Sequence, residues 1–367
     1  MKFVASKETL SKLITSIQNV VSHKPTIPIL SNFLIQAKGK ELTVTATDLT
    51  VGIRCTGEAE IIEEGAITLP AKRFFQLTKE LTAPSLEIRS KDGETSELIA
   101  GTSHFKFNGM HRKDFPELPD LNSATSVVLS QKDLKEMFFR TSFAASREDS
   151  RYVLTGILLK IENKKALFVG ADGKRLAEAS STLEIDDSFQ GEYIIPLKAV
   201  DEIAKSLSEK GDVTLFLMPD KIAAEIDQLL IVTKLLSGTY PDFKRIIPDK
   251  LEIKASLHRE ELTSLLRQVS LFTDEENQSA KFLFADGSLS LKANNSSIGE
   301  GLVSMPVNYH REPFAIAFNP HILLDILRHC RSEVVQLGLN DPYNPGVITD
   351  ESSARFVIMP MRLNDAS

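Results

Sequence analysis

One local pattern occurs six times along the chain. A short apolar run, typical of a strand, meets a residue that favours helix initiation and then an amphipathic segment carrying Lys or Arg. The initiating residues are Ser6, Pro70, Ser130, Pro196, Ser256 and Asn319. Ser and Asn are preferred N-cap residues, and Pro suits the first position of a helix, so each junction predicts a helix start. The successive steps of 64, 60, 66, 60 and 63 residues indicate one structural unit repeated six times.

The length of the chain groups these units in pairs. A chain of 367 residues suits two or three domains, and six units suit three domains of about 120 residues. Leu10, Leu134 and Leu262 begin equivalent helices, 124 and 128 residues apart. Polar segments that contain Pro precede the third and fifth copies and mark the boundaries. We therefore predict domains at residues 1–123, 124–249 and 250–367.

Apolar periodicity predicts the secondary structure of each unit. Helices are expected at 7–21, 71–81, 131–146, 197–210, 258–272 and 320–331. Strands are expected at 33–37, 42–46, 53–56, 156–161, 166–170, 229–234, 281–285 and 289–292. Asp48, Asp172 and Asn294 follow equivalent strands, where Asp and Asn commonly form turns. One helix against several antiparallel strands makes each unit an α+β arrangement.

Charge is distributed unevenly over this pattern. The net charge is −7, but the six predicted helices sum to +5, which leaves −12 for the rest of the chain. Basic helices beside acidic strands favour binding of a polyanion through the helices. The alternative is that Lys and Arg are simply good helix formers. The candidate helix cations that would face a polyanion are Lys12, Lys72, Arg73, Lys79, Lys135, Arg140, Lys198, Lys205, Arg267 and Arg328.

Several classes of protein are disfavoured by composition. No apolar run approaches the roughly 18 residues of a membrane span, and no secretory apolar region follows the first residues, so we expect no membrane contact. Cys55 and Cys330 fit neither a disulfide framework nor a metal pattern and are expected to be buried thiols. These features favour a reducing, cytoplasmic location.

The sequence contains no recognisable catalytic motif. The stretch 170–174 resembles a phosphate-binding loop, but Phe168 stands where the first Gly is needed and Arg175 replaces the Ser or Thr that holds magnesium. We expect no catalytic residue, metal or cofactor. Two alternatives stay open: a nuclease-like DNA-modifying enzyme with a dispersed active site, and a protein-interaction scaffold with no role on DNA.

Four motifs, together with the repeat, carry a resemblance to a known family. They are 24–32 (KPTIPILSN), 171–177 (ADGKRLA), 240–248 (YPDFKRIIP) and 357–363 (VIMPMRL). In order and over residues 1–363, the chain closely resembles the beta subunit of bacterial DNA polymerase III, the sliding clamp. The resemblance implies the DNA-clamp fold, with three similar domains per subunit and a ring-shaped head-to-tail homodimer lined by helices.

The resemblance also implies a function and partners. Clamps encircle duplex DNA without sequence preference, and they tether the polymerase alpha subunit, the clamp loader and other clamp-motif proteins. It implies DNA contact at Lys24 and in the loop 147–152. Related clamps often have a DNA-contacting Gln in this loop; Glu148 departs from that pattern, and we expect Arg147 to make the contact instead. With the helix cations, the expected DNA-binding residues are Lys24, Lys72, Arg73, Arg147, Tyr152 and Lys198.

Two further surfaces follow from the same resemblance. Partner peptides are expected in a hydrophobic cleft formed by Arg151, Val153, Leu154, Ala171, Gly173, Lys174, Arg175, Leu176, Pro241, Arg245, Ile246, Asn319, Ile322, Gly346, Val357, Met359, Met361 and Arg362. Leu154, Leu176 and Ile246 are alternatively core residues. The dimer interface is expected at Phe105, Phe107, Leu271 and Phe272. A short extension, Asn364–Ser367, adds negative charge beyond the last motif.

Overall fold

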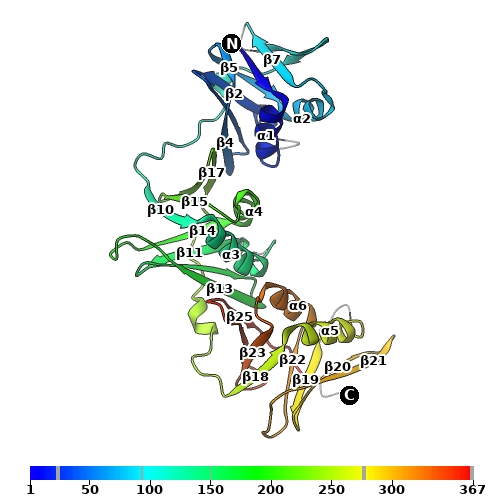
Figure 1. Cartoon of the computed structure of the whole chain (residues 1–367). Helices are drawn as coiled ribbons and strands as arrows, with labels where there is room; N and C mark the ends of the chain where they lie inside the picture. The colour runs from blue at the N-terminus through cyan, green and yellow to red at the C-terminus, as the bar shows by residue number, and fades with distance from the viewer. Residues whose placement is uncertain (22–24, 92–93, 149, 275–277, 364–367) are drawn as a thin grey trace. The chain divides into compact units, whose positions relative to one another are not determined.

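The computed structural model describes residues 1–21, 25–91, 94–148, 150–274 and 278–363 (Figure 1). All six predicted helices are present in these ranges: α1 (Lys7–Ile17), α2 (Ala71–Glu80), α3 (Gln131–Thr141), α4 (Leu197–Ser206), α5 (Arg259–Ser270) and α6 (Pro320–His329). Their first residues are 64, 60, 66, 62 and 61 apart, so the sixfold period is confirmed. Within the described residues, no helix is long and apolar enough to cross a membrane.

Three of the four predicted Ser or Asn caps are formed. The hydroxyl oxygens of Ser6 and Ser130 accept amide hydrogens from Thr9 and Asp133, at 2.9 and 3.0 Å. The carboxamide oxygen of Asn319 accepts from the amides of the first turn of α6, where Pro320 occupies the first helical position. These bonds satisfy amides that have no partner inside the helix.

At the two Pro junctions the helices begin where predicted. Pro70 and Pro196 end strands instead of taking the first helical position, and α2 and α4 begin at Ala71 and Leu197. Ser256 was predicted to initiate the helix expected over 258–272, but it lies inside a strand that continues to His258. Its hydroxyl pairs with the Gln336 side chain across the neighbouring strand, and backbone pairing extends to His258, so α5 starts only at Arg259.

The helices also end earlier than predicted. After α1, Val20 and Val21 stay buried although the helix has ended, and Ala144 and Ala145 do the same after α3. Residues 142–144 form a short 3₁₀ turn rather than a further α-helical turn. The apolar period therefore continues past the helix end and gives no signal of termination.

The described strands form four antiparallel sheets. The first contains β5 (Glu60–Glu63), β1 (Lys2–Ser6), β7 (Ser85–Ser90), β8 (Thr95–Ala100) and β9 (Ser103–Asn108), in this order. The second contains β10 (Thr125–Ser130), β15 (Asp212–Leu217), β16 (Lys221–Ile226), β17 (Leu229–Lys234), β4 (Val51–Glu58), β3 (Glu41–Thr47), β2 (Asn32–Lys38) and β6 (Gly65–Pro70).

The other two sheets repeat this arrangement with later strands. The third contains β14 (Gly191–Pro196), β11 (Gly156–Glu162), β12 (Lys165–Ala171), β13 (Arg175–Thr182), β25 (Arg355–Ile358), β24 (Gly346–Thr349), β23 (Val334–Leu339) and β18 (Ile253–His258). The fourth contains β21 (Gly299–Pro306), β20 (Ser288–Asn295), β19 (Ala280–Ala285) and β22 (Phe314–Phe318). The α+β prediction is confirmed.

Contacts divide the chain into two compact units. The first unit contains residues 1–134 and 198–235, and the second contains residues 135–197 and 236–367. The middle third of the chain therefore contributes to both units. The domain boundaries predicted from the repeat follow a different criterion, the sequence unit, and stay a prediction.

Each unit buries one face of its helices on a sheet. In the first, α1 buries Leu10, Ile14 and Ile17 and packs on β3 and β4. In the second, α5 buries Leu262 and Leu266, packs on β20 and lies beside α6 (Figure 1). Full burial of one such side chain contributes about 1.5–3 kcal/mol to the stability of the fold. Helices this short are only marginally stable in isolation, so this packing stabilises them.

Asx turns recur at equivalent strand ends. Asp48 and Asp172 each accept hydrogen bonds from the backbone amides two and three residues ahead. In the third copy the same two bonds are made by Asn295, not by the predicted Asn294. Asn295 is buried, whereas Asn294 is exposed on the strand. Because the two residues are identical and adjacent, the sequence does not show which one forms the turn.

Both cysteines are buried free thiols, as predicted. Burial raises the pKa of the Cys55 thiol and of the Cys330 thiol to about 12. Neither thiol therefore ionises near neutral pH, and both behave as small apolar side chains.

The distinction between Ser130 and Ser256 is testable. Ser130→Ala removes a helix cap and should lower the free energy of unfolding by about 1 kcal/mol. Ser256→Ala removes only an exposed hydroxyl from a strand and should change it by less than about 0.5 kcal/mol. Urea unfolding followed by circular dichroism measures both, and equal losses would contradict the assignment of Ser256 to a strand.

Candidate functional site

The predicted peptide-binding residues come from several elements of the second unit. The C-terminal segment runs from β25, which pairs with β13, toward β22. The amide of Met359 donates to the carbonyl of Lys174 at 2.9 Å, and that of Met361 donates to Ala317 at 2.8 Å. These bonds fix the last motif of the sequence beside the turn that follows β12.

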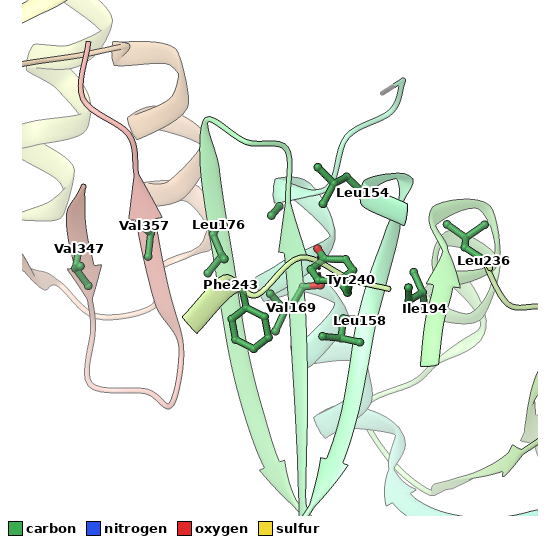
Figure 2. Packing of buried hydrophobic residues seen from close by; sticks show 11 residues of the cluster. Leu154, Leu158, Val169, Leu176, Ile194, Leu236, Tyr240, Phe243, Val347 and Val357 are labelled. Atoms are coloured by element: carbon green, nitrogen blue, oxygen red, sulfur yellow. Dashed lines mark hydrogen bonds between the residues drawn. The ribbon is translucent and has the colours of Figure 1, made fainter. Parts of the chain in front are cut away.

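A buried apolar cluster includes Val357 at the start of this segment (Figure 2). Its members are Leu154, Leu158, Val169, Ala171, Leu176, Ile194, Leu236, Tyr240, Phe243, Val347 and Val357. Four predicted site residues are therefore in it: Leu154, Ala171, Leu176 and Val357. Leu154 and Leu176 are only 2% exposed, so their interpretation as core residues is confirmed. Tyr240 and Phe243 complete the cluster, and sequence analysis did not single them out.

Three other predicted residues, Val153, Ile246 and Met359, are less buried than the cluster, and we call them the exposed layer. Ile246 and Met359 are 39% and 37% exposed, so the interpretation of Ile246 as core is wrong. Val153 is half-buried and packs against the cluster. Apolar side chains that are exposed in this way can contact an apolar peptide. The cluster then acts as support, and Val153, Ile246 and Met359 are the residues available for contact.

The arginines around this layer differ in their freedom. The side chain of Arg245 is 85% exposed and pairs with Asp242 at 2.8 Å. Arg175 is mostly buried: it bonds Asp172 and Asp325 at 3.0 and 2.9 Å, and its guanidinium lies over the Phe143 ring. Arg175 thus links β13 to α6, whereas Arg245 remains accessible.

Arg151 lies over the turn that contains Gly173. Its Nη2 donates to the carbonyl of Asp172 at 3.4 Å. A Cβ on Gly173 would be 2.7 Å from this guanidinium, and Gly173 has a φ of +84°. Both facts favour glycine at this position, because the backbone is left-handed and the space is filled by Arg151.

The remaining predicted residues occupy different depths. Asn319 caps α6 and donates from Nδ2 to Gln278 at 3.1 Å, and Ile322 in the same helix is half-buried. Gly346 is buried in β24, and Met361 is half-buried. The exposed ones are Lys174, Pro241 and Arg362. Asn364–Ser367 lies outside the described residues.

Arg140 is not a surface cation, which corrects its prediction as a DNA-facing residue. Its side chain is 3% exposed and bonds Glu136 and Asp350, both at 2.7 Å. Burial opposes ionisation of Asp350, but hydrogen bonds from the Arg331 amide, from Ser352 and from Arg140 outweigh it and lower the pKa of this carboxyl to about 2. This ionic cluster joins α3 to the strands of the C-terminal third.

Aromatic side chains adjoin the ionic cluster. The His329 ring stacks on Phe143 at 3.9 Å between centroids and lies 4.5 Å from Phe139. Burial lowers the pKa of His329. The ring nitrogen Nδ1 lies 2.7 Å from the carbonyl oxygen of Asp325 and so bonds to the helix that carries it. We call Phe139, Arg140, Phe143 and His329 the filled junction.

The predicted DNA-binding residues lie mostly on the surface. Lys72 and Arg73 are exposed on α2, and Arg147 and Tyr152 are exposed in the loop before β11. Lys198 bonds the carboxylate of Asp48. Lys24 lies outside the described residues. These side chains are accessible to a polyanion except where Lys198 is held by Asp48.

Burial opposes ionisation of Asp48, but bonds from Lys198 and from the amides of its own turn lower its pKa overall. The ion pair is therefore intact at neutral pH and restrains the Lys198 ammonium group.

The predicted interface residues lie on or beside edge strands. Phe105 and Phe107 are half-buried on β9, an edge of the first sheet. Leu271 is 71% exposed after α5, and Phe272 packs against Gly301 of β21, an edge of the fourth sheet. Sequence analysis missed the apolar residues of this second edge: Ile298 and Leu302 are each 64% exposed.

Among the residues that the structure describes, no group of three or more His, Cys, Asp or Glu side chains is placed to hold a metal ion.

Comparison with known proteins gives a consistent result along the chain. Models of the DNA polymerase III beta subunit match residues 1–119 (N-terminal domain), 128–242 (central domain) and 244–362 (C-terminal domain). The beta sliding clamp of Chlamydia pneumoniae is 54% identical over the full length of both chains. That of Vibrio cholerae is 29% identical over 99% of this chain and all of its own.

Solved structures agree with the sequence relatives. The sliding clamp of Pseudomonas aeruginosa bound to griselimycin has a TM-score of 0.94 and 29% identity, covering 99% of this chain and all of that one. The clamp of Bartonella birtlesii bound to griselimycin has a TM-score of 0.92, 31% identity and the same coverage.

The low pKa of Asp350 predicts how pH affects stability. Because its folded pKa lies below the usual value, the carboxylate stabilises the fold above about pH 4, and this contribution is lost as pH falls toward 2. Asp350→Asn has no such proton to bind. The difference in unfolding free energy between wild type and Asp350→Asn should therefore shrink between pH 5 and 2.5 in urea titrations. A difference that stays constant would contradict the ion pair.

Proposed function

Because this chain belongs to the DNA polymerase III beta subunit family, the bacterial sliding clamps, we propose specific roles for its surfaces in a clamp. The protein is a non-catalytic accessory subunit of the polymerase holoenzyme. This subunit encircles duplex DNA and tethers the polymerase. The observation that carries this conclusion is similarity over the full chain, in both sequence and fold. The nuclease and scaffold alternatives lack such support.

Two copies joined head to tail would close the ring. A head-to-tail contact gives a closed ring when the rotation that relates neighbouring subunits is a whole fraction of 360°. Two subunits with six units each would supply twelve helices. We propose that β9 of one copy meets β21 of the other. Supporting this, both strands are sheet edges, and the half-buried Phe105 and Phe107 and the exposed Leu271 offer apolar surface. Phe272 would complete the contact.

The helices would carry the DNA contacts. Lys and Arg facing phosphates give a sequence-independent, salt-sensitive attraction that permits sliding. We assign this role to Lys24, Lys72, Arg73, Arg147 and Lys198, with Tyr152 beside them. Lys198 contributes less than Arg73, because Asp48 already neutralises it. A ring retained by topology needs only modest attraction, which agrees with a helix sum of +5.

The exposed layer would receive partner peptides. We propose that Val153, Ile246 and Met359 contact an apolar peptide motif, with Arg245 orienting it from the edge. The polymerase alpha subunit, the clamp loader and other clamp-motif proteins would compete for this surface. Tethering raises the effective concentration of polymerase at the primer end.

We propose three domains, at residues 1–123, 124–249 and 250–367, and a cytoplasmic location. The three family matches support the domains, because their ends fall near these boundaries. Replication of bacterial DNA takes place in the cytoplasm, and two buried free thiols suit a reducing compartment.

Neutralising helix cations tests the DNA contact. The double variant Lys72→Ala, Arg73→Ala should lower the amount of protein loaded on primed circular DNA by roughly three- to tenfold at 150 mM salt, with a weaker salt dependence. Loading is measured by gel filtration after incubation with clamp loader and ATP.

The matched control is the double variant Lys38→Ala, Lys40→Ala, which removes two exposed cations from the β2–β3 hairpin. It should load like wild type. Equal losses in the two double variants would show that net charge, not the α2 surface, determines loading.

Met359 tests the peptide surface. Met359→Ala should weaken binding of a polymerase-derived clamp-motif peptide by about tenfold, because Met359 is an exposed apolar side chain of the C-terminal motif. Fluorescence anisotropy measures the affinity, and sedimentation confirms that the dimer is intact.

Met110 provides the control, since it has the same 37% exposure in the first unit. Met110→Ala should leave peptide affinity unchanged. If Met359→Ala also left it unchanged, the assigned surface would be wrong.

A further inference from the structure

Internal repetition allows one part of the chain to be compared with another, residue by residue. The helices α1 and α3 start 124 residues apart, and α4 and α6 start 123 apart. The buried positions coincide in this register: Leu10 matches Leu134, and Ile14 matches Phe138. The α1–α4 pair in the first unit is thus the counterpart of the α3–α6 pair in the second.

The same register changes the residues of the filled junction. Phe139, Arg140 and Phe143 of α3 and the segment after it correspond to Thr15, Ser16 and Asn19, and His329 of α6 corresponds to Ser206. Two aromatic rings, a guanidinium and an imidazole are replaced by four small polar side chains. Similar backbones with much smaller side chains leave space between the helices.

That space is a pocket of about 640 Å³ in the first unit. All four small residues line it, with Lys12, Glu202 and Asp227 also in the wall. We call it the α1–α4 pocket. Its volume lies in the range of sites for small organic molecules.

The acceptor that holds Arg140 in the filled junction has a counterpart in the α1–α4 pocket. Asp350 lies between β24 and β25, and Asp227 occupies the equivalent turn between β16 and β17, 123 residues earlier. Asp350 receives Arg140 and is fully buried. Asp227 is exposed, and its carboxylate has no hydrogen bond or ion pair within the described ranges.

The other charges of the pocket are of two kinds. Glu202 is already satisfied: it accepts hydrogen bonds from Asn19 at 3.2 Å and from Lys205 at 2.8 Å. Lys12 takes the place of Glu136, so the charge opposite the guanidinium position is reversed. A ligand would therefore meet an available carboxylate at Asp227 and an ammonium group at Lys12.

We propose that the α1–α4 pocket binds a planar aromatic molecule with a guanidinium or amidinium group at one end and a carboxylate at the other. The ring takes the space that Phe139 and Phe143 fill in the filled junction. The guanidinium pairs with Asp227, the counterpart of the Asp350 carboxylate that receives Nη1 of Arg140. The carboxylate faces Lys12. Lys12 and Lys205 of this wall are among the candidate cations named above, whereas Lys72, Arg73 and Lys198, to which DNA contact is assigned, lie outside the pocket. The proposal does not depend on those assignments.

The probe is 4-guanidinobenzoate, which has both charged groups on one ring. Saturation-transfer NMR on the full-length protein should give a dissociation constant on the order of 1 mM, as expected for a molecule of this size. Benzoate, which lacks the guanidinium, should show no measurable transfer.

Asp227→Asn should weaken probe binding about tenfold. The matched control is Asp286→Asn, because Asp286 is an exposed turn residue with nearly the same positive φ, 48° against 52°, and lies outside the pocket. Asn accepts this backbone conformation well, so both variants should fold. The control should bind like wild type.

Ser16→Arg places the guanidinium of the filled junction in the α1–α4 pocket. It should abolish probe binding and raise the melting temperature, because the new side chain pairs with Asp227. Absence of binding to wild type at 20 mM probe would overturn the proposal. Equal affinity of wild type and Asp227→Asn would do so as well, whether or not Ser16→Arg folds.

Discussion

Antiparallel pairing between strands of different repeats is the constraint on which the rest of the structure depends. In the first unit β17 pairs with β4, where Leu229 lies opposite Cys55. In the second, β13 pairs with β25, where Leu176 lies opposite Val357. Each pairing converts two small sheets into one of eight strands and covers two edges that would otherwise attract other strands. The C-terminal segment and the apolar cluster take their places from the third sheet and α1 packs on the second, whereas α5 packs on the fourth.

The sequence predicts the existence and spacing of the repeated helices better than the residues at which they begin and end. Capping by Ser6, Ser130 and Asn319 depends on neighbours within three residues, so a local pattern is sufficient. Ser256 fits the same pattern, but its partner, Gln336, is 80 residues away. Helix ends are concealed because burial continues beyond them, as Val20 and Ala144 show.

The candidate site was predictable in composition but not in depth. The motif residues Leu176 and Val357 are adjacent in the sheet, and sequence placed both in one site. Whether each is buried depends on Tyr240 and Phe243, which cross the strands from a distant segment (Figure 2). Arg140 has the same difficulty: a helix cation is normally solvated, and its burial becomes favourable when Asp350, 210 residues later, joins Glu136 as a partner.

Copies of one unit have therefore kept their backbone and diverged in their side chains, with a filled junction in one place and a pocket in another. Closure of two such chains around DNA is the central claim, and retention on DNA of different topology tests it most directly. Protein loaded on nicked circular DNA should remain bound in raised salt and dissociate within seconds to minutes after one restriction cut, because only topology holds it. Equal loss from circular and linear DNA would contradict the account.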